Sequence, residues 1–358
     1  MRLDVRHCAL AAVLVVIASS CAGGGSVREK GSPAGIAASP EAPPVICPLT
    51  GQQRPADFPI SRPTVAIKIE NSTASRPQAG LEKADIVYEE LAEGGITRFM
   101  ALFHCSDASR AGPVRSARSV DPDILLEYAP VLFGYAGANR VVLNKVVGTR
   151  GVVDLRDGIR PGAYKRVQDR ERPHNLFTST EELRALSKVR GAPTVGLAFR
   201  PPASPQPFPA SGVPGTAPMP LLAHGWRPGT STSFSFGGET VRYVYDGATL
   251  TYLRSHGQIP HRAEGGRQLG VANVVVLKVK VTQGTIRDAA GNVSPEIAVV
   301  GEGEATVLSQ GFALPGRWRR PSLSDDTRLV DSSGNPILLY PGNTWIHLVP
   351  EQHPIGIQ

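Results

Sequence analysis

Basic and polar side chains gather in three short segments of the first half of the sequence. The candidates for ligand binding are Arg98, Arg115, Arg118, Arg172, His174 and Asn175. Arginine presents a planar fork of N–H donors that suits phosphate or carboxylate oxygens. Histidine and asparagine in the same place would orient the ligand or titrate against it. This set predicts a site for an anion.

The predicted strands place part of this set at a strand end. Two apolar segments, 85–91 and 96–103, flank a Gly94-Gly95 turn and should pair as a hairpin. If they pair, Arg115 and Arg118 emerge just past the end of a strand, where sites commonly form.

The residue types alone favour a structural role for this set over a bound anion, and catalysis is a third possibility. Arginines in loops often pair with carboxylates such as Asp121, Asp123 or Glu127, and a His-Asn pair in a turn often caps backbone groups. For three further residues, core or interface roles are favoured over ligand contacts: His261, Trp318 and Trp345.

Asp85 and Asp121 are weak candidates for a divalent metal, because their carboxylates would either balance the arginines or supply oxygen ligands. No cofactor is predicted. The sequence has no phosphate-binding loop ending in Gly-Lys-Ser/Thr, no His-Glu-x-x-His helix and no Gly-x-Ser-x-Gly turn. These absences weigh against common NTPases, zinc peptidases and serine hydrolases, and leave an unfamiliar enzyme open.

The first residues have the pattern of an export signal. Arg2 and Arg6 precede an apolar run over 9–18, which is shorter than the roughly 20 apolar residues that cross a bilayer. We therefore expect residues 1–20 to be a signal peptide.

The end of that signal resembles a bacterial lipobox, in which the cysteine becomes the lipidated first residue. Cys21 would carry the lipid, although Ala18 stands where a lipobox usually has Leu, Val or Ile. Ordinary signal cleavage beside a chance cysteine is the alternative. A lipidated Cys21 would hold the protein on the outer face of the cytoplasmic membrane, with the Gly/Ser/Pro-rich segment 21–45 as a flexible tether.

Composition predicts two turn-rich domains with much β-structure. The chain has 358 residues, 41% of them hydrophobic, with 32 prolines, 38 glycines and only 19% charged residues. Its formal net charge of +7 suits anionic lipids, wall polymers or nucleic acid as partners, or simply a solvated surface. The charges are scattered, and export makes nucleic acid a poor candidate.

We expect an α+β N-terminal domain with a mixed sheet over 46–200 and a mainly-β C-terminal domain, sandwich or barrel-like, over 235–358. The Pro-rich segment 201–234 between them is predicted to be a linker or long loop.

Local patterns predict individual elements. Segment 64–70 alternates as a strand with one buried and one wetter face, and helices are expected at 121–128 and 181–188. Cys47 and Cys105 remain after export and predict a disulfide, since no neighbouring Cys or His suits zinc.

Several segments resemble the YerB-like lipoprotein family, a two-domain family of unknown function. In the first domain they are Cys-Pro-Leu-Thr-Gly (47–51), Arg-Pro-Gln-Ala-Gly-Leu (76–81), Ala-Asp-Ile-Val-Tyr-Glu (84–89), Glu-Gly-Gly-Ile-Thr-Arg-Phe (93–99), Gly-Pro-Val-Arg-Ser-Ala-Arg (112–118) and Pro-His-Asn-Leu (173–176). In the second they are Pro-His (260–261), Ala-Asn-Val (272–274) and Pro-Gly-Asn-Thr-Trp-Ile (341–346). The resemblance implies an envelope lipoprotein of two linked domains and implies no activity.

Two hypotheses follow. The first is a binding module that binds an anionic envelope polymer, a lipid precursor or a partner protein through the arginine-rich surface. The second is a transferase or hydrolase acting on phosphate-linked wall or lipid precursors.

Overall fold

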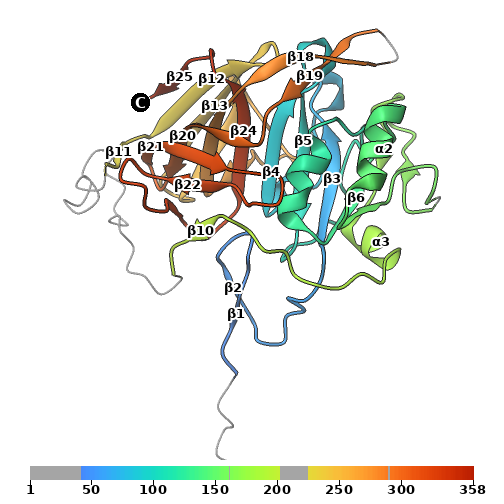
Figure 1. The fold of residues 1–358 in the computed structure, drawn as a ribbon, viewed down its shortest axis with the longest axis horizontal. Helices are drawn as coiled ribbons and strands as arrows, with labels where there is room; N and C mark the ends of the chain where they lie inside the picture. The colour runs from blue at the N-terminus through green and yellow to red at the C-terminus, as the bar shows by residue number, and fades with distance from the viewer. Residues whose placement is uncertain (1–41, 161, 202–224, 289–290) are drawn as a thin grey trace, which may run out of the picture. The chain divides into compact units, whose positions relative to one another are not determined.

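β-strands dominate the computed structural model, which describes residues 42–160, 162–201, 225–288 and 291–358 (Figure 1). The predicted signal 1–20, the lipidation site Cys21 and nearly all of the tether lie outside the described residues. So does most of the predicted linker, although strand β11 (Arg227–Pro228) lies within its range and strand β12 (Ser231–Phe236) begins within it. Among the described residues, no helix has the length and apolar character needed to cross a membrane.

One large mixed sheet runs through both halves of the chain. It has 11 strands, ten of them in the order β11-β21-β20-β17-β24-β4-β5-β3-β6-β7, with β22 pairing β21. Their bounds after β11 are β21 (Phe312–Arg320), β20 (Gly301–Ser309), β17 (Asn273–Val279), β24 (Thr344–Pro350), β4 (Ile86–Leu91), β5 (Thr97–Phe103), β3 (Thr64–Glu70), β6 (Val131–Gly134), β7 (Val152–Asp154) and β22 (Arg328–Val330).

The two halves meet where β24 lies between β17 and β4. β24 pairs in parallel with β17 on one side and with β4 on the other, so that His347 stands beside Glu89. In Figure 1 the dark red β24 lies next to the cyan β4 in the middle of the sheet. The hydrogen-bonded ladder is therefore continuous from residues of the first half to residues of the second.

A six-stranded sheet from the second half covers one face of the large sheet. Its strands after β12 are β13 (Glu239–Asp246), β14 (Thr251–His256), β15 (Ile259–Pro260), β16 (Gly270–Val271) and β25 (Ile355–Ile357). Phe234 and Tyr243 of this sheet belong to the same buried cluster as Phe99 and Trp345 of the large one. The two sheets form a sandwich, and the expected α+β first half and mainly-β second half are confirmed.

Helices cover the other face at the end nearer β6 (Figure 1). They are α1 (Asp121–Leu125), the 3-10 turn η4 (Leu126–Tyr128) and α2 (Arg140–Gly148), which bury Ile124 and Val146 against strand residues such as Met100. The third helix, α3 (Thr180–Ala185), instead adds Leu183 to the buried cluster that the six-stranded sheet shares. It begins where Ser179 accepts a hydrogen bond from the backbone N–H of Glu182 at 3.1 Å. Both helices predicted from sequence are present.

The remaining elements are short. The two-stranded pairs are β1 (Val45–Ile46) with β2 (Gln53–Arg54), β8 (Lys165–Arg166) with β9 (Leu176–Phe177), β10 (Ala198–Phe199) with β23 (Leu338–Leu339), and β18 (Val281–Arg287) with β19 (Val293–Ile297). The 3-10 turns are η1 (Thr73–Ser75), η2 (Leu81–Lys83) and η3 (Glu93–Gly95).

Segment 64–70 differs from its prediction. It forms β3, but all seven residues are buried, including Lys68 and Glu70 on the side that alternation predicts to be wetter. The error has a physical cause: the helical layer closes over that side, and carboxylates and cations from other segments pair with the two charges.

The structure contains the predicted disulfide between Cys47 and Cys105, whose Cα atoms are 6.0 Å apart. It fastens the first turn of the described chain to the residues that follow β5, across a sequence separation of 58. We expect replacement of both cysteines by alanine to lower the free energy of unfolding by about 4 kcal/mol, because the reduced unfolded chain regains loop entropy. Urea unfolding of the native and double-variant proteins measures this loss, and thiol labelling of both cysteines in the native protein would contradict the bridge.

Candidate functional site

Charged side chains stand in a row at one end of β3, β5 and β4, on the face that the helices cover. Arg98 of β5 lies directly across from Glu70 of β3 and Glu90 of β4. All three are buried. Opposite charges on directly facing positions stabilise strand pairing, so this row helps to fix the register of the three strands.

Lys68 continues this row into the interior. Its Nζ contacts Glu90 and lies 2.7 Å from Asp121 Oδ1, while the other oxygen of Asp121 accepts the backbone N–H of Arg118 at 2.7 Å. Burial lowers the pKa of Lys68 to about 8, against the attraction of Asp121. Asp121, a weak metal candidate from the sequence, thus binds the start of α1 to the sheet.

Three of the predicted arginines converge above the row. Arg98 donates to the carbonyl of Ser116 at 3.0 Å, and Arg118 contacts Glu93. The pKa of Arg98 is lowered to about 9, first by burial and then by repulsion from Arg118 and Arg115. The guanidinium groups are therefore close enough to repel one another.

Glu70 joins this cluster to the surface. Its Oε2 lies 2.9 Å from His174 Nδ1 and 3.4 Å from Arg115 Nε, and its Oε1 accepts the hydroxyl of Ser72 at 2.8 Å. The side chains of Arg115 and His174 are each 23% exposed, whereas that of Glu70 is 2% exposed. The mouth of the cluster therefore presents an arginine and a histidine to solvent. We call Arg98, Arg115, Arg118 and His174 the basic site.

The structure places the other predicted residues elsewhere. Asn175 is buried, and its amide joins Arg166 and the carbonyl of Val167, both at 3.0 Å, which holds the β8–β9 hairpin. Arg172 is exposed in the loop before His174.

Asp85, the second weak metal candidate, accepts the backbone N–H groups of His104 at 2.6 Å and Cys105 at 2.8 Å. Burial raises its pKa. Asp85 and Asp121 therefore have different partners and do not share one site. Within the described ranges, no group of three or more His, Cys, Asp or Glu side chains could hold a metal ion.

An open cleft of about 310 Å³ lies beside the basic site. Gly94 and Gly95 line one side, and the β18–β19 hairpin lines the other. Glu93 connects the two features, since one carboxylate oxygen contacts Arg118 and the other contacts the hydroxyl of Ser294 in β19. Glu93 thus lies between the basic site and the residues that line the cleft.

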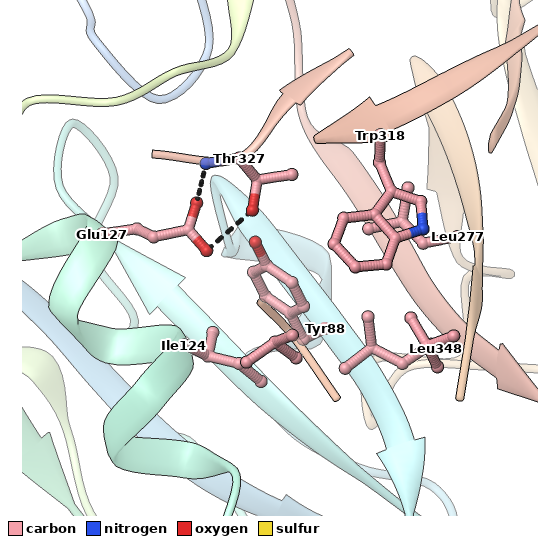
Figure 2. Close-up of a pocket in the computed structure, with 9 residues that line it drawn as sticks. Tyr88, Ile124, Glu127, Leu277, Trp318, Thr327 and Leu348 are labelled. Atoms are coloured by element: carbon pink, nitrogen blue, oxygen red, sulfur yellow. Dashed lines mark hydrogen bonds between the residues drawn. The ribbon is translucent and has the colours of Figure 1, made fainter. Parts of the chain in front are cut away.

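A second, enclosed cavity lies under α1 and is too small for a ligand. Its volume is about 10 Å³, room for at most one water. Figure 2 shows Glu127 turned toward Thr327, whose backbone N–H and hydroxyl donate to its carboxylate at 2.8 and 2.9 Å. The Tyr88 hydroxyl points the same way and is 2.8 Å from the hydroxyl of Tyr128. These contacts close the cavity and have a structural role.

A separate charge network lies on the opposite face of the sheet. Glu89 of β4 receives two hydrogen bonds from Arg254 of β14, at 2.9 and 3.1 Å, and lies 3.0 Å from His347 of β24. All three are buried. Burial alone would raise the pKa of Glu89, but Arg254 and His347 outweigh it and hold this pKa far below its ordinary value. This network joins the two sheets.

Two further histidines complete the network. One guanidinium nitrogen of Arg254 lies 2.8 Å from His256 Nε2 and 2.5 Å from His261 Nδ1, so both rings accept from a cation and must be neutral. Burial and then Arg254 lower the pKa of His256 to about 2, and the pKa of His261 falls well below its ordinary value for the same reasons. The position of His261 in this network agrees with the core role favoured from sequence.

Sequence reasoning missed the carboxylates that organise both networks: Glu70, Glu89 and Glu93. A signal for two of them was present, because Glu70 and Glu89 stand inside or at the end of otherwise apolar strand segments. Buried charges need partners, so a charged residue in such a segment indicates a paired cluster.

Most of the chain matches the models of one protein family. The model for the N-terminal domain of the "Protein of unknown function (DUF3048)" family matches residues 49–193, and the model for its C-terminal domain matches residues 231–346. The chain belongs to this family, and the family predicted from sequence motifs is confirmed.

A curated relative is the "Putative lipoprotein YerB" of Bacillus subtilis (strain 168). It is 26% identical over 312 residues, which cover 85% of this chain and 86% of the relative. A crystal structure of the YerB protein from Bacillus subtilis superimposes with a TM-score of 0.69 at 23% identity, over 87% of this chain and 99% of that one. This likeness shows a shared fold.

The neutral buried histidines make stability depend on pH. His104, His256, His261 and His347 all have a lowered pKa, chiefly through burial. In the unfolded chain each is protonated below about pH 6.5. Above that pH the histidines are neutral in both states, and the free energy of unfolding does not depend on their titration. As the pH falls below the pKa of the unfolded chain, the unfolded state gains protons that the folded state does not, and each histidine lowers the free energy of unfolding by up to about 1.4 kcal/mol per pH unit.

Unfolding titrations with urea from pH 8 to pH 5 measure this slope. We expect a plateau down to about pH 7 and a steep decline below about pH 6.5. The variant His261→Gln keeps an acceptor for Arg254 and removes one titrating group. Its free energy of unfolding should therefore change less steeply with pH, by the contribution of one histidine. A stability that does not change between pH 7 and pH 5 would contradict the neutral network.

Proposed function

We propose that this protein is a lipid-anchored envelope protein that binds an anionic envelope component through its basic site. The component is a phosphate- or carboxylate-bearing wall polymer, a lipid precursor or an acidic surface of a partner protein. The lipid on Cys21 after removal of residues 1–20, and a position on the outer face of the cytoplasmic membrane, are part of this proposal. The signal-like sequence and the relative's description as a lipoprotein support them.

The observation that carries the proposal is the crowding of three arginines, of which Arg115 alone reaches the mouth that is open to solvent. Arg98 and Arg118 donate to the same carbonyl, that of Ser116, at 3.0 and 3.3 Å. Arg98 has its pKa lowered by burial and by its two neighbours, and it forms no ion pair with a carboxylate among the described residues. A bound anion would relieve the repulsion and give these donors charged acceptors. Arg115, partly exposed at the mouth, would contact the anion first.

A transferase or hydrolase acting on phosphate-linked wall or lipid precursors is the second candidate function. Its support is that His174, a residue type able to accept and release protons near neutral pH, shares the mouth with Arg115.

Thermal unfolding in the presence of pyrophosphate tests the binding proposal on residues 42–358. We expect millimolar pyrophosphate to raise the Tm of the native protein by at least about 2 °C, because a ligand that binds only the folded state stabilises it. Arg115→Ala should unfold near the native Tm without ligand, because Glu70 keeps Ser72 and His174 as hydrogen-bond partners, and it should show no shift with ligand.

The matched control is Arg150→Ala, which removes one exposed positive charge after α2. It should keep the full shift. Equal shifts in both variants, or no shift in the native protein, would contradict the proposal. Arg118 is unsuitable for this test, because its removal leaves Glu93 buried without a cation, at a cost of about 3–5 kcal/mol.

A further inference from the structure

We propose that His174 is a general base, positioned by Glu70, for hydrolysis of a phosphodiester or pyrophosphate bond held at the basic site. This inference rests on the proposed anion binding, since Arg115 and its neighbours would hold the phosphate group. It adds an activity to the site: His174 would contact the attacking water, and Glu70 would act by positioning His174.

The geometry fixes which ring nitrogen of His174 carries the proton. Nδ1 lies 2.9 Å from Oε2 of Glu70. A carboxylate offers only acceptors, so Nδ1 donates to it and the lone pair of the neutral ring stands on Nε2. Glu70 is itself held in place, with Oε1 accepting from Ser72 at 2.8 Å and its backbone carbonyl accepting from Gln78 at 3.0 Å.

The second nitrogen of His174 is available to a ligand. Within the described part of the chain no partner contacts Nε2, and the side chain is 23% exposed. The loop that carries the ring is anchored on both sides, by the backbone N–H of His174 to the carbonyl of Glu171 at 2.9 Å and by Asn175 to Val167 at 3.0 Å. The ring is thus held in one orientation while Nε2 stays accessible to a ligand.

The histidines of the network on the opposite face of the sheet differ in this respect. His261 has Nδ1 against Arg254 and Nε2 against Gln78, and His347 has its two nitrogens against Glu89 and Tyr243. Both are buried. Their nitrogens are occupied by structural contacts, whereas His174 combines a buried carboxylate partner with an open nitrogen.

The reaction needs water and the phosphate substrate alone. Nε2 of His174 takes a proton from a water molecule as the water oxygen forms a bond to phosphorus. The bond from phosphorus to the leaving oxygen breaks on the opposite side; that oxygen takes a proton from solvent, and the imidazolium returns its proton to solvent. A phosphodiester gives a phosphomonoester and an alcohol, and a pyrophosphate gives two phosphates. Arg115 would stabilise the negative charge that the non-bridging oxygens carry in the transition state.

The first experiment measures release of p-nitrophenolate from bis(p-nitrophenyl) phosphate by residues 42–358. General bases contribute about 10²–10⁴-fold to rates, so His174→Gln should lower kcat at least 100-fold with little change in KM. Glu70→Gln should lower kcat at least tenfold, because the ring loses its fixed tautomer. Arg150→Ala, purified in the same way, should match the native protein. Native turnover no faster than that of His174→Gln overturns the proposal.

The second experiment separates a positioning role of Glu70 from a merely structural one. Ring ¹⁵N chemical shifts of His174 at neutral pH should show a protonated Nδ1 and an unprotonated Nε2 in the native protein, and a mixture of tautomers in Glu70→Gln. A native ring protonated on Nε2 overturns the assignment.

The two proposals fail in different ways. If pyrophosphate raises the Tm of both the native protein and His174→Gln while neither hydrolyses the diester, anion binding stands and the general base is wrong. If pyrophosphate raises the Tm of neither protein, and the native protein hydrolyses nothing, both are wrong.

Discussion

The rest of the structure depends on the placement of β24 between β17 and β4. This strand comes from the end of the chain and pairs in parallel with a strand of the second half and with one of the first. Because both edges of β24 are used, neither half keeps a complete sheet without the other. The same pairing sets His347 beside Glu89, to which Arg254 is brought by the six-stranded sheet. Backbone pairing and the buried charge network therefore stabilise one another.

Strand alternation divides the charges of β4 between two environments. Glu89 and Glu90 are neighbours in sequence, but successive side chains of a strand point to opposite faces. Glu89 enters the network between the two sheets, where it contacts Arg254 and His347. Glu90 faces the helical layer with Lys68 and stands across from Arg98. One end of the sheet thus carries a sealed network on one face and a cluster open to solvent on the other.

Much of the fold follows from local signals, and the site follows only in part. Both helices have clear starts, and Cys47 and Cys105 predict a disulfide because they are the two cysteines outside the predicted signal and lipidation site. The pairing of β24 with β4 had no local signal, since it joins segments far apart in sequence. Lys68 in β3 was assigned to a wetter face because charges in strands usually face water, and its partner Asp121 comes from another segment. Three of the predicted arginines lie near one another, and their role in ligand binding stays a prediction. Glu70, the carboxylate that contacts Arg115 and His174, was not predicted.

The two networks differ in how fully their cations are satisfied. Arg254 pairs with a carboxylate through two hydrogen bonds and stacks near Phe99 and Trp345, with centroids 5.4 and 5.3 Å away. Breaking such a buried pair is costly, so this face stabilises the fold. Arg98 instead donates to a backbone carbonyl and is repelled by its neighbours. A fold stabilised on one face tolerates such an unfavourable arrangement on the other, and sites that bind ligands commonly have this character. The contrast favours the open face as the place where an anion completes the structure.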